Sequence, residues 1–167
     1  MIVLRLRPYN VADAETILSW VDDETTYYNW CAGILGKYPL TVKQFNKVTD
    51  HMAFTAIEGD EVVGFFMLRI SKDYPDEVRF CFVVVNEKKR GMGYGKKMLT
   101  LGVKYAKEIY GAKKATLGVF INNENAYKCY KKVGFNEMSL NEKIKYKVGH
   151  EIWDGIEMEL DLSKVVG

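Results

Sequence analysis

The chain has 167 residues, of which 48% are hydrophobic, and this supports one domain with a substantial core over residues 1–167. Its 24 basic and 22 acidic residues give a net charge of +2, which argues against a nucleic-acid-binding protein. No apolar stretch approaches the roughly 20 residues that cross a bilayer, and the N-terminus lacks a signal-peptide pattern. We therefore expect a cytoplasmic protein that binds neither nucleic acid nor membrane.

The cysteines and histidines show no pattern that indicates a disulfide or a metal site. Cys31, Cys81 and Cys129 are odd in number and have no C-x-x-C spacing, so we expect buried free thiols. His51 and His150 lie far apart in the sequence and belong to no local ligand motif. We predict no metal.

The first third of the chain predicts a strand followed by helices. Residues 2–7 alternate apolar and basic side chains and end at Pro8, which is typical of a half-buried strand. Asn10 is a suitable cap for a helix that continues to Trp20. Residues 22–41 are rich in aromatic side chains and interrupted by glycine and proline, so their pattern is ambiguous, and a short helix is expected over 42–48.

The pattern then changes to that of a sheet. Residues 52–70 contain two apolar runs separated by Glu-Gly-Asp, which predicts a hairpin. Residues 78–85 form an almost unbroken β-branched and aromatic run, as expected for a central strand covered on both faces. Residues 94–110 have the spacing of an amphipathic helix that ends at Gly111.

The last part of the chain predicts one more strand and helix before two final strands. Residues 113–121 form the strand, and Asn122 or Asn123 caps a helix that ends at Gly134. The final strands are expected around 135–146 and 152–162. This order of elements predicts an α/β protein with a mixed sheet.

The segment KKRGMGYGKKML, residues 88–99, has three glycines on alternate positions between a buried strand and a long helix. Amides at a helix start are unpaired, and glycine lets an anion such as phosphate approach them. A Walker A loop would require glycine instead of Arg90, and a G-x-G-x-x-G motif would require glycine instead of Lys96. The alternative to an anion site is a tight turn with a solvated basic surface.

The spacing Val85-x-x-x-x-Arg90-x-x-Gly93-x-Gly95 resembles the acetyl-CoA signature of the GNAT superfamily of N-acetyltransferases, with Glu87 where proline is common. Residues 117–135 resemble the later motif of this superfamily. The matching positions are Leu117, Val119, Asn123, Ala126, Tyr130, Gly134 and Phe135. Both motifs occur in the right order on the expected elements, and the chain is identified as a member of this superfamily.

The resemblance implies a GNAT-like fold whose strands ending at Val85 and starting near Ala115 splay apart, which opens a cleft for acetyl-CoA. Backbone groups of the first strand would bind the pantetheine arm, and the amides from Arg90 to Lys96 would bind the pyrophosphate, with these two side chains as flanking charges. The residues expected to bind the cofactor are Phe82, Val83, Val84, Val85, Arg90, Gly91, Met92, Gly93, Tyr94, Gly95, Lys96, Asn123, Ala126 and Tyr130.

The resemblance also implies the chemistry. Tyr130 would protonate the departing thiolate, because a phenol with a pKa of about 10 can donate to a thiol with a pKa of about 8.5 in a tuned site. Packing alone would also explain this tyrosine. Glu77 is the candidate base for the amine, although Arg79 occupies a nearby position where some relatives carry glutamate. Holding the two reactants together would need no base.

In this superfamily the first helices and last strands bind the acceptor. The candidates are Tyr27, Tyr28, Trp30 and Trp153, with Tyr38 and Asp154 beside them. Aromatic rings and a carboxylate suit a cationic amine, but a core role would explain the rings equally well. The sequence does not identify the acceptor, which could be a ribosomal-protein N-terminus, a polyamine, an aminoglycoside or an amino acid derivative.

The sequence thus predicts an acetyl-CoA-dependent N-acetyltransferase that acts on a primary amine, and relatives make a homodimer a further expectation. A non-catalytic acyl-CoA-binding module is the alternative, against which the retained Tyr130 argues. A nucleic-acid-binding protein is disfavoured by the balanced charge.

Overall fold

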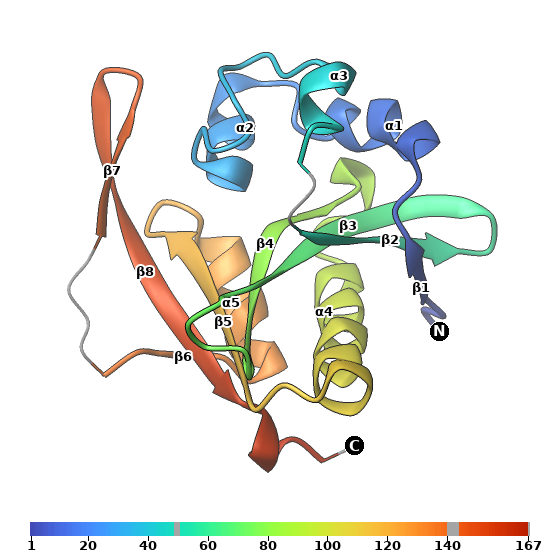
Figure 1. Cartoon of the computed structure of the whole chain (residues 1–167). Helices are drawn as coiled ribbons and strands as arrows, with labels where there is room; N and C mark the ends of the chain where they lie inside the picture. Colours follow the sequence, from blue (N-terminus) through green and yellow to red (C-terminus); the bar gives the residue numbers. More distant parts are fainter. Residues whose placement is uncertain (49–50, 140–143, 167) are drawn as a thin grey trace.

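The computed structural model describes residues 1–48, 51–139 and 144–166, which form a mixed sheet with helices on both faces (Figure 1). The strands are β1 (Arg5–Pro8), β2 (Met52–Glu58), β3 (Glu61–Ile70), β4 (Glu77–Val85), β5 (Lys114–Phe120), β6 (Asn136–Glu137), β7 (Ile144–Val148) and β8 (Glu151–Asp161). The α-helices are α1 (Ala14–Ser19), α2 (Glu24–Cys31), α3 (Val42–Phe45), α4 (Tyr94–Lys104) and α5 (Glu124–Val133). Short helical segments are η1 (Val11–Asp13), η2 (Glu87–Lys89), η3 (Tyr105–Tyr110) and η4 (Leu162–Lys164).

The sheet has the order β1-β2-β3-β4-β5-β8-β6, and β7 pairs with β8. Neighbouring strands are antiparallel except β4 and β5, which are parallel because α4 connects them. The predicted α/β class and mixed sheet are confirmed.

The local signals of the N-terminal half have clear structural counterparts. The Asn10 side chain accepts a hydrogen bond from the amide of Ala12 and so begins η1, which leads into α1. The ambiguous segment contains α2, whose cap Asp23 accepts from the amide of Thr26. The hairpin of β2 and β3 turns at Gly59, where φ is 60°. The helix expected over 42–48 is shorter, because α3 ends at Phe45.

The C-terminal half differs from the prediction mainly in its last strands. The helix that begins at Tyr94 continues through the π-helical η3 to Gly111, whose φ of 84° ends it as expected. The strand expected around 135–146 is divided into β6 and β7, and residues 140–143 lie outside the described part of the chain. Cys31 is fully buried as expected, whereas Cys81 and Cys129 are only partly buried.

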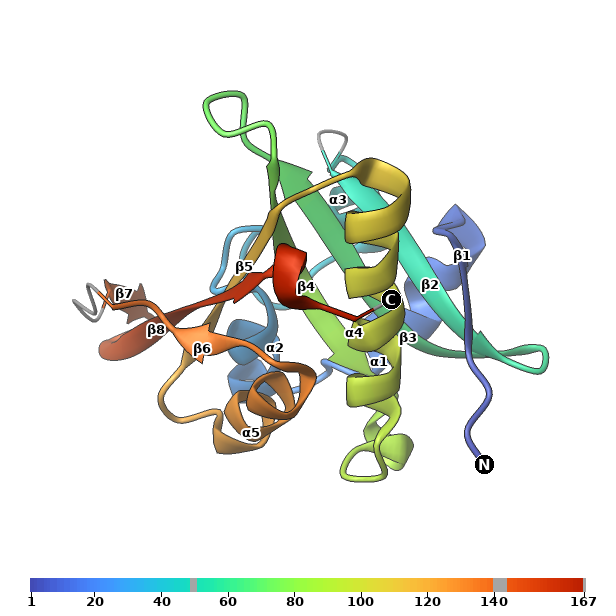
Figure 2. The same cartoon turned by 90° about the horizontal axis from the view of Figure 1, so that it is seen from below.

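Two hydrophobic cores lie on opposite faces of the sheet. One core packs α4, α5 and η4 against the strands and includes Leu99, Tyr130 and Phe135. The other packs α1, α2 and α3 against β3 and β4 and includes Ile17 and Phe45. Figure 2 shows α4 crossing the strands on one side, with α1 to α3 on the other. The helices α1 to α3 therefore cover one face of β4 while α4 and α5 cover the other.

A bulge divides β4 between these two cores. Val78 and Phe80 face the core of α4, whereas Phe82 and Val84 face the core of α1 to α3, although strict alternation would keep all four on one face. The switch occurs at Phe82, whose φ is 54°, where the register against β3 shifts. The bulge thus turns the second half of β4 relative to the first.

The parallel strands β4 and β5 pair only at their first residues. Glu77 to Arg79 pair with Lys114 to Thr116, and beyond this point the two strands separate toward the top of Figure 1. From Phe80 onward, β4 is paired with β3 alone. The predicted splay is confirmed, and it leaves backbone groups of β4 facing an opening.

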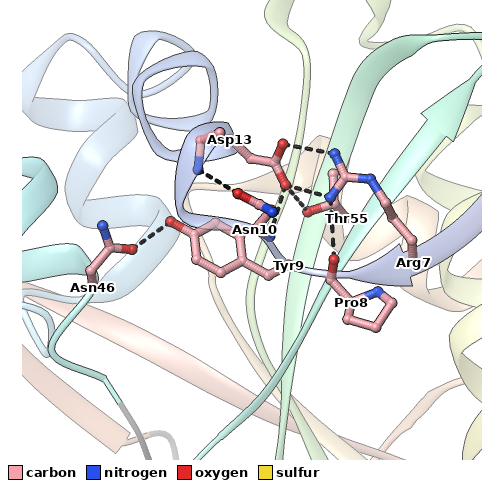
Figure 3. A network of polar contacts seen from close by, with 8 residues as sticks. Arg7, Pro8, Tyr9, Asn10, Asp13, Asn46 and Thr55 are labelled. Carbon is pink, nitrogen blue, oxygen red and sulfur yellow. Dashed lines mark hydrogen bonds and ion pairs between the residues drawn. The ribbon is translucent and has the colours of Figure 1, made fainter.

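A polar network holds the N-terminal helices on the sheet (Figure 3). The Arg7 guanidinium donates to both carboxylate oxygens of Asp13 at 2.7 and 2.8 Å, and the Thr55 hydroxyl on β2 donates to the same carboxylate at 2.9 Å. The Tyr9 hydroxyl donates to the Asn46 side chain at 2.6 Å, which joins the end of α3 to β1. This network positions the helices that form one wall of the opening.

Candidate functional site

The opening between β4 and β5 is a cavity of about 810 Å³, within the range of small-molecule sites. Its walls are the second half of β4, the glycine segment, the start of α4, the middle of β5 and one side of α5. The side chains or backbone of all the predicted cofactor residues line this cavity except Met92 and Tyr94.

The glycine segment lines the cavity and leaves the first-turn amides of α4 without a side-chain cap. Gly91 and Gly93 have φ values of 75° and 89°, a conformation that other residues adopt only with strain. Gly93 is the cap residue of α4 and has no side chain to bond the amides of the first turn, which also have no partners within the helix. These amides, with the cationic Lys96, Lys128 and Lys132 on the same cavity, suit a pyrophosphate.

Arg90 holds this segment in place. Its guanidinium donates to the carbonyl of Val85 at 3.1 Å and to the carbonyl of Trp20 at 2.8 Å. Burial lowers the pKa of this guanidinium, against the attraction of nearby carboxylates. Two of its donors therefore act on the protein itself, tying the glycine segment to β4 and to the end of α1.

The two remaining residues of the glycine segment point elsewhere. The Met92 side chain is 60% exposed, and the Tyr94 side chain is buried. The Tyr94 hydroxyl donates to Glu58 on β2 at 2.8 Å, and the ammonium of Lys89 lies 4.9 Å from the ring centre. The expected cofactor contacts of these two residues are thus restricted to their backbone amides.

Tyr130 lines the cavity from α5. The Asn123 side chain accepts a hydrogen bond from the amide of Ala126 at 3.4 Å. Of Asn122 and Asn123, the second is therefore the residue that caps α5. Tyr130 is 8% exposed, and its hydroxyl has no hydrogen-bond partner among the described residues. Burial raises the pKa of this phenol well above its usual value, with a smaller contribution from Cys129. The hydroxyl therefore stays protonated at neutral pH.

A second cavity of about 460 Å³ adjoins the first. The residues that line both are Asn29, Trp30, Phe80, Phe82, Gly118 and Val119. Trp30 is fixed in this shared wall because its indole donates to the carbonyl of Phe82 at 2.7 Å. The carbonyl oxygen of the Asn29 side chain is buried in the same wall without a hydrogen-bond partner among the described residues. The two cavities thus lie next to one another beside β4 and share a wall.

Of the predicted acceptor residues, Trp30 lines these two cavities and the others line neither of them. The expectation for Tyr27 does not fit its position, because Tyr27 is buried in the core and its hydroxyl donates to the carbonyl of Gly36 at 2.7 Å. Tyr28 packs on Tyr27, and its hydroxyl accepts from the amide of Tyr38 at 3.3 Å. Trp153 packs against a ring of β5 and donates to a neighbouring glutamate of β8 at 2.9 Å. Their aromatic character reflects packing at these positions.

Glu77 lies away from both cavities, at the paired ends of β4 and β5. Its carboxylate is 3.2 Å from the ammonium of Lys114, which also contacts Glu159 at 2.9 Å. This position does not support the expected role as a base. Within the described ranges, no group of three or more His, Cys, Asp and Glu is arranged to hold a metal ion, and no helix there is long and apolar enough to cross a membrane.

Several residues of the second cavity were missed by the sequence analysis. Arg69 on β3 and Glu157 on β8 line it, and Arg79 on β4 donates to both oxygens of Glu157 at 2.8 and 3.0 Å. Burial disfavours the charge of Arg79, but the hydrogen bonds that it donates to Glu157 outweigh burial and raise its pKa. In the sequence, these residues stand out only as charged side chains within otherwise apolar strands. The pairing of the strands is needed to show that they lie together.

Comparisons with known proteins agree with this geometry. Residues 14–135 match the model of the acetyltransferase (GNAT) family. An N-alpha-acetyltransferase of Sulfurisphaera tokodaii is 38% identical over 98 residues, which are 53% of this chain and 59% of that protein. A spermine/spermidine N(1)-acetyltransferase of Bacillus subtilis is 33% identical over 99 residues, which are 54% of this chain and 64% of that protein. The chain thus matches less than two thirds of the length of these curated relatives.

Solved structures match over nearly the whole chain. The spermidine N-acetyltransferase of Vibrio cholerae, solved with CoA and spermine, has a TM-score of 0.81 at 16% identity, covering 96% of each chain. A putative phosphinothricin N-acetyltransferase has a TM-score of 0.74 at 18% identity, covering 97% of this chain and 100% of the other. These similarities concern the fold. Because the family model spans most of the chain, this protein belongs to the acetyltransferase (GNAT) family.

Proposed function

We propose that the protein transfers an acetyl group from acetyl-CoA to a primary amine of a small molecule, with Tyr130 as the acid that protonates the departing thiolate. The observation that carries this proposal is Tyr130, which is 8% exposed and lines the larger cavity, and whose hydroxyl has no hydrogen-bond partner among the described residues. A phenol hydroxyl that lines a cavity and bonds no protein group is available to donate its proton to a ligand group.

The arrangement of the larger cavity supports binding of coenzyme A. The free amides and lysines at the glycine segment are suited to the pyrophosphate, and the unpaired side of β4 is suited to the amide groups of the pantetheine arm. Acetyl-CoA supplies an activated thioester carbonyl. An arm that runs along β4 from the glycine segment would bring this group toward the wall shared with the second cavity.

In the proposed acetyl transfer, each bond formed and each proton released is balanced as follows. The acceptor nitrogen attacks from the second cavity, the new N–C bond forms and the C–S bond breaks. Tyr130 gives its proton to the sulfur and regains one from solvent, while the nitrogen releases a proton to solvent. Juxtaposition of the reactants in adjoining cavities supplies much of the rate, so this scheme requires no dedicated base.

Comparison of Tyr130→Phe with wild type tests the proposal. We expect kcat, measured as free thiol released from acetyl-CoA with an amine panel, to fall by about 10²- to 10⁴-fold, while the calorimetric Kd for CoA changes little. Tyr127→Phe is the matched control on the same helix, because its hydroxyl donates to Glu137 and it lines neither cavity. This control should retain activity.

Each other result has a distinct meaning. Equal activity of Tyr130→Phe and wild type would remove the acid role while leaving acetyl transfer in place. Tight binding of CoA without turnover on any amine would favour an acyl-CoA-binding module. Absence of CoA binding to the wild type would overturn the proposed function.

A further inference from the structure

The second cavity contains two arginines and one carboxylate. Arg69 on β3 and Arg79 on β4 are directly opposite each other in the antiparallel register, and both line the cavity. Like charges in this arrangement destabilise a sheet unless they are neutralised. Glu157 neutralises Arg79 through two hydrogen bonds, but Arg69 has no ion pair or hydrogen bond within the described ranges.

The charge of this cavity does not suit a polyamine. The charged side chains that line it within the described ranges are Arg69, Arg79 and Glu157, so one positive charge remains uncompensated. An acceptor that carries several ammonium groups would add like charge to this cavity. A carboxylate would supply the missing negative charge, and a guanidinium binds it through two parallel hydrogen bonds.

The wall that the second cavity shares with the larger one contains a hydrogen-bond acceptor. The Asn29 carbonyl oxygen is buried at the wall shared by both cavities and has no partner among the described residues. Buried polar atoms are normally satisfied, so a vacant acceptor beside a cavity is suited to an N–H donor of a ligand. This atom lies at the wall between the second cavity and the larger cavity. In the proposed function, the amine that receives the acetyl group meets the thioester at this wall.

We propose that the acceptor is an amine that also carries a carboxylate, with its amino group at Asn29 and its carboxylate at Arg69. This inference rests on the proposed function and narrows its acceptor class. The shared wall includes Phe80 and Phe82, which follow Arg79 on β4 by one and three residues, or roughly 3–10 Å along the strand. Free amino acids of various lengths and peptide N-termini with an acidic side chain both satisfy this chemistry.

Matched acceptors test the proposal in the wild-type protein. We would compare kcat/KM for glycine, 4-aminobutanoate and 6-aminohexanoate with that of their primary amides, and include spermidine and 1,4-diaminobutane. The peptide amides Ser-Glu-NH₂ and Ser-Gln-NH₂ separate a peptide source from a free amino acid. We expect at least one carboxylate to exceed its neutral partner and both polyamines by tenfold or more.

Variants assign the preference to residues. Arg69→Gln should lower the carboxylate-to-amide ratio of kcat/KM by about tenfold or more, and Arg69→Lys should restore part of it. Asn29→Ala should raise KM for the carboxylate and the amide alike. Arg5→Gln removes an equal charge from an exposed residue of β1 that has no ion pair in the described ranges and lines neither cavity. This control should leave the ratio unchanged.

Binding provides a measurement that does not depend on turnover. 4-Acetamidobutanoate and 6-acetamidohexanoate should bind to the CoA complex of wild type, measured by calorimetry, and at least tenfold more weakly to Arg69→Gln. If no amine is acetylated but this loss is observed, the carboxylate site at Arg69 stands while the proposed function, and with it the acceptor role, fails. If amines are acetylated but amides or polyamines are preferred, or if the ratio does not change in Arg69→Gln, the inference is overturned alone. No turnover and no binding overturn both.

Discussion

Asp13 is the centre of the contacts that hold the first helices on the sheet. Its side chain is 6% exposed and accepts hydrogen bonds from Arg7, from Thr55 and from the amide of Asn10. Burial disfavours the charge of this carboxylate, but the hydrogen bonds outweigh burial and lower its pKa below the usual 3.8. A carboxylate with a lowered pKa stabilises the folded state as long as it is ionised.

We expect Asp13→Asn to lower the free energy of unfolding by about 2 kcal/mol at pH 7, because a charged hydrogen-bond acceptor is lost. The contribution of Asp13 is fully present above the pKa of the unfolded state and is lost as pH falls through the lower pKa of the folded state. The difference between variant and wild type should therefore shrink between pH 4 and pH 2 in urea unfolding. Asp73→Asn, which removes an exposed carboxylate, serves as control. An equal difference at both pH values would contradict this account.

Neighbouring residues of α2 show why the acceptor site was hard to predict. Tyr27 and Trp30 are one helical turn apart and both aromatic, yet Tyr27 is enclosed in the core while Trp30 reaches the cavities. Asn29 is a candidate ligand-binding residue only because its side-chain oxygen is buried at the shared wall, which the sequence does not show. Composition cannot separate these cases, since packing and binding favour the same side chains.

The start of α4 acts as a unit with the glycine segment before it. Gly93 combines a φ of 89° with the cap position, so the direction of the first-turn amides depends on a conformation that suits glycine. The local motifs were predictable from sequence because a turn, a cap and a strand end are each determined by adjacent residues. The bulge of β4 was not, because the run over 78–85 reads as regular strand and the shift depends on pairing with β3.

We expect Gly93→Ala to weaken CoA binding by tenfold or more, because a side chain at this φ strains the backbone and displaces the amides. The measurement is calorimetric titration with CoA. Gly59→Ala is the matched control, since Gly59 also has a positive φ of 60° but lies in the hairpin turn away from the cavities. Both variants should lose about 1–2 kcal/mol of stability, and only the first should lose affinity. Equal affinities would show that the amides of this turn do not hold the pyrophosphate.

At the scale of the whole molecule, the sheet consists of two parts joined at the base of β4 and β5. Two motifs over residues 85–95 and 117–135 were enough to predict this arrangement and the family. These motifs could not predict the second cavity. Its residues come from α2, β3, β4, β5 and β8, and they are brought together only by the sheet order. Its net positive charge likewise emerges only from the register that pairs Arg69 with Arg79.

A ligand that contacts both parts should stabilise the whole fold. With CoA at 100 times its Kd we expect a gain of about 2.7 kcal/mol and a rise in Tm of about 5–10 °C in a thermal unfolding assay. Adenosine 3′,5′-bisphosphate, which lacks the pantetheine arm, should give a smaller rise at the same concentration. Equal rises with the two compounds would indicate that the arm does not bind between the strands.

The ion pair of Arg79 and Glu157 has a mechanical consequence for this opening. It joins β4 to β8 across β5, and it starts from Arg79, the last residue of β4 that pairs with β5. It passes over Gly118, where an added Cβ would lie 2.9 Å from the Arg79 guanidinium, so the absence of a side chain there leaves room for the pair. Because β5 and β8 are paired along their length, the ion pair ties β4 to both of them and opposes further separation of β4 from β5 where the opening begins.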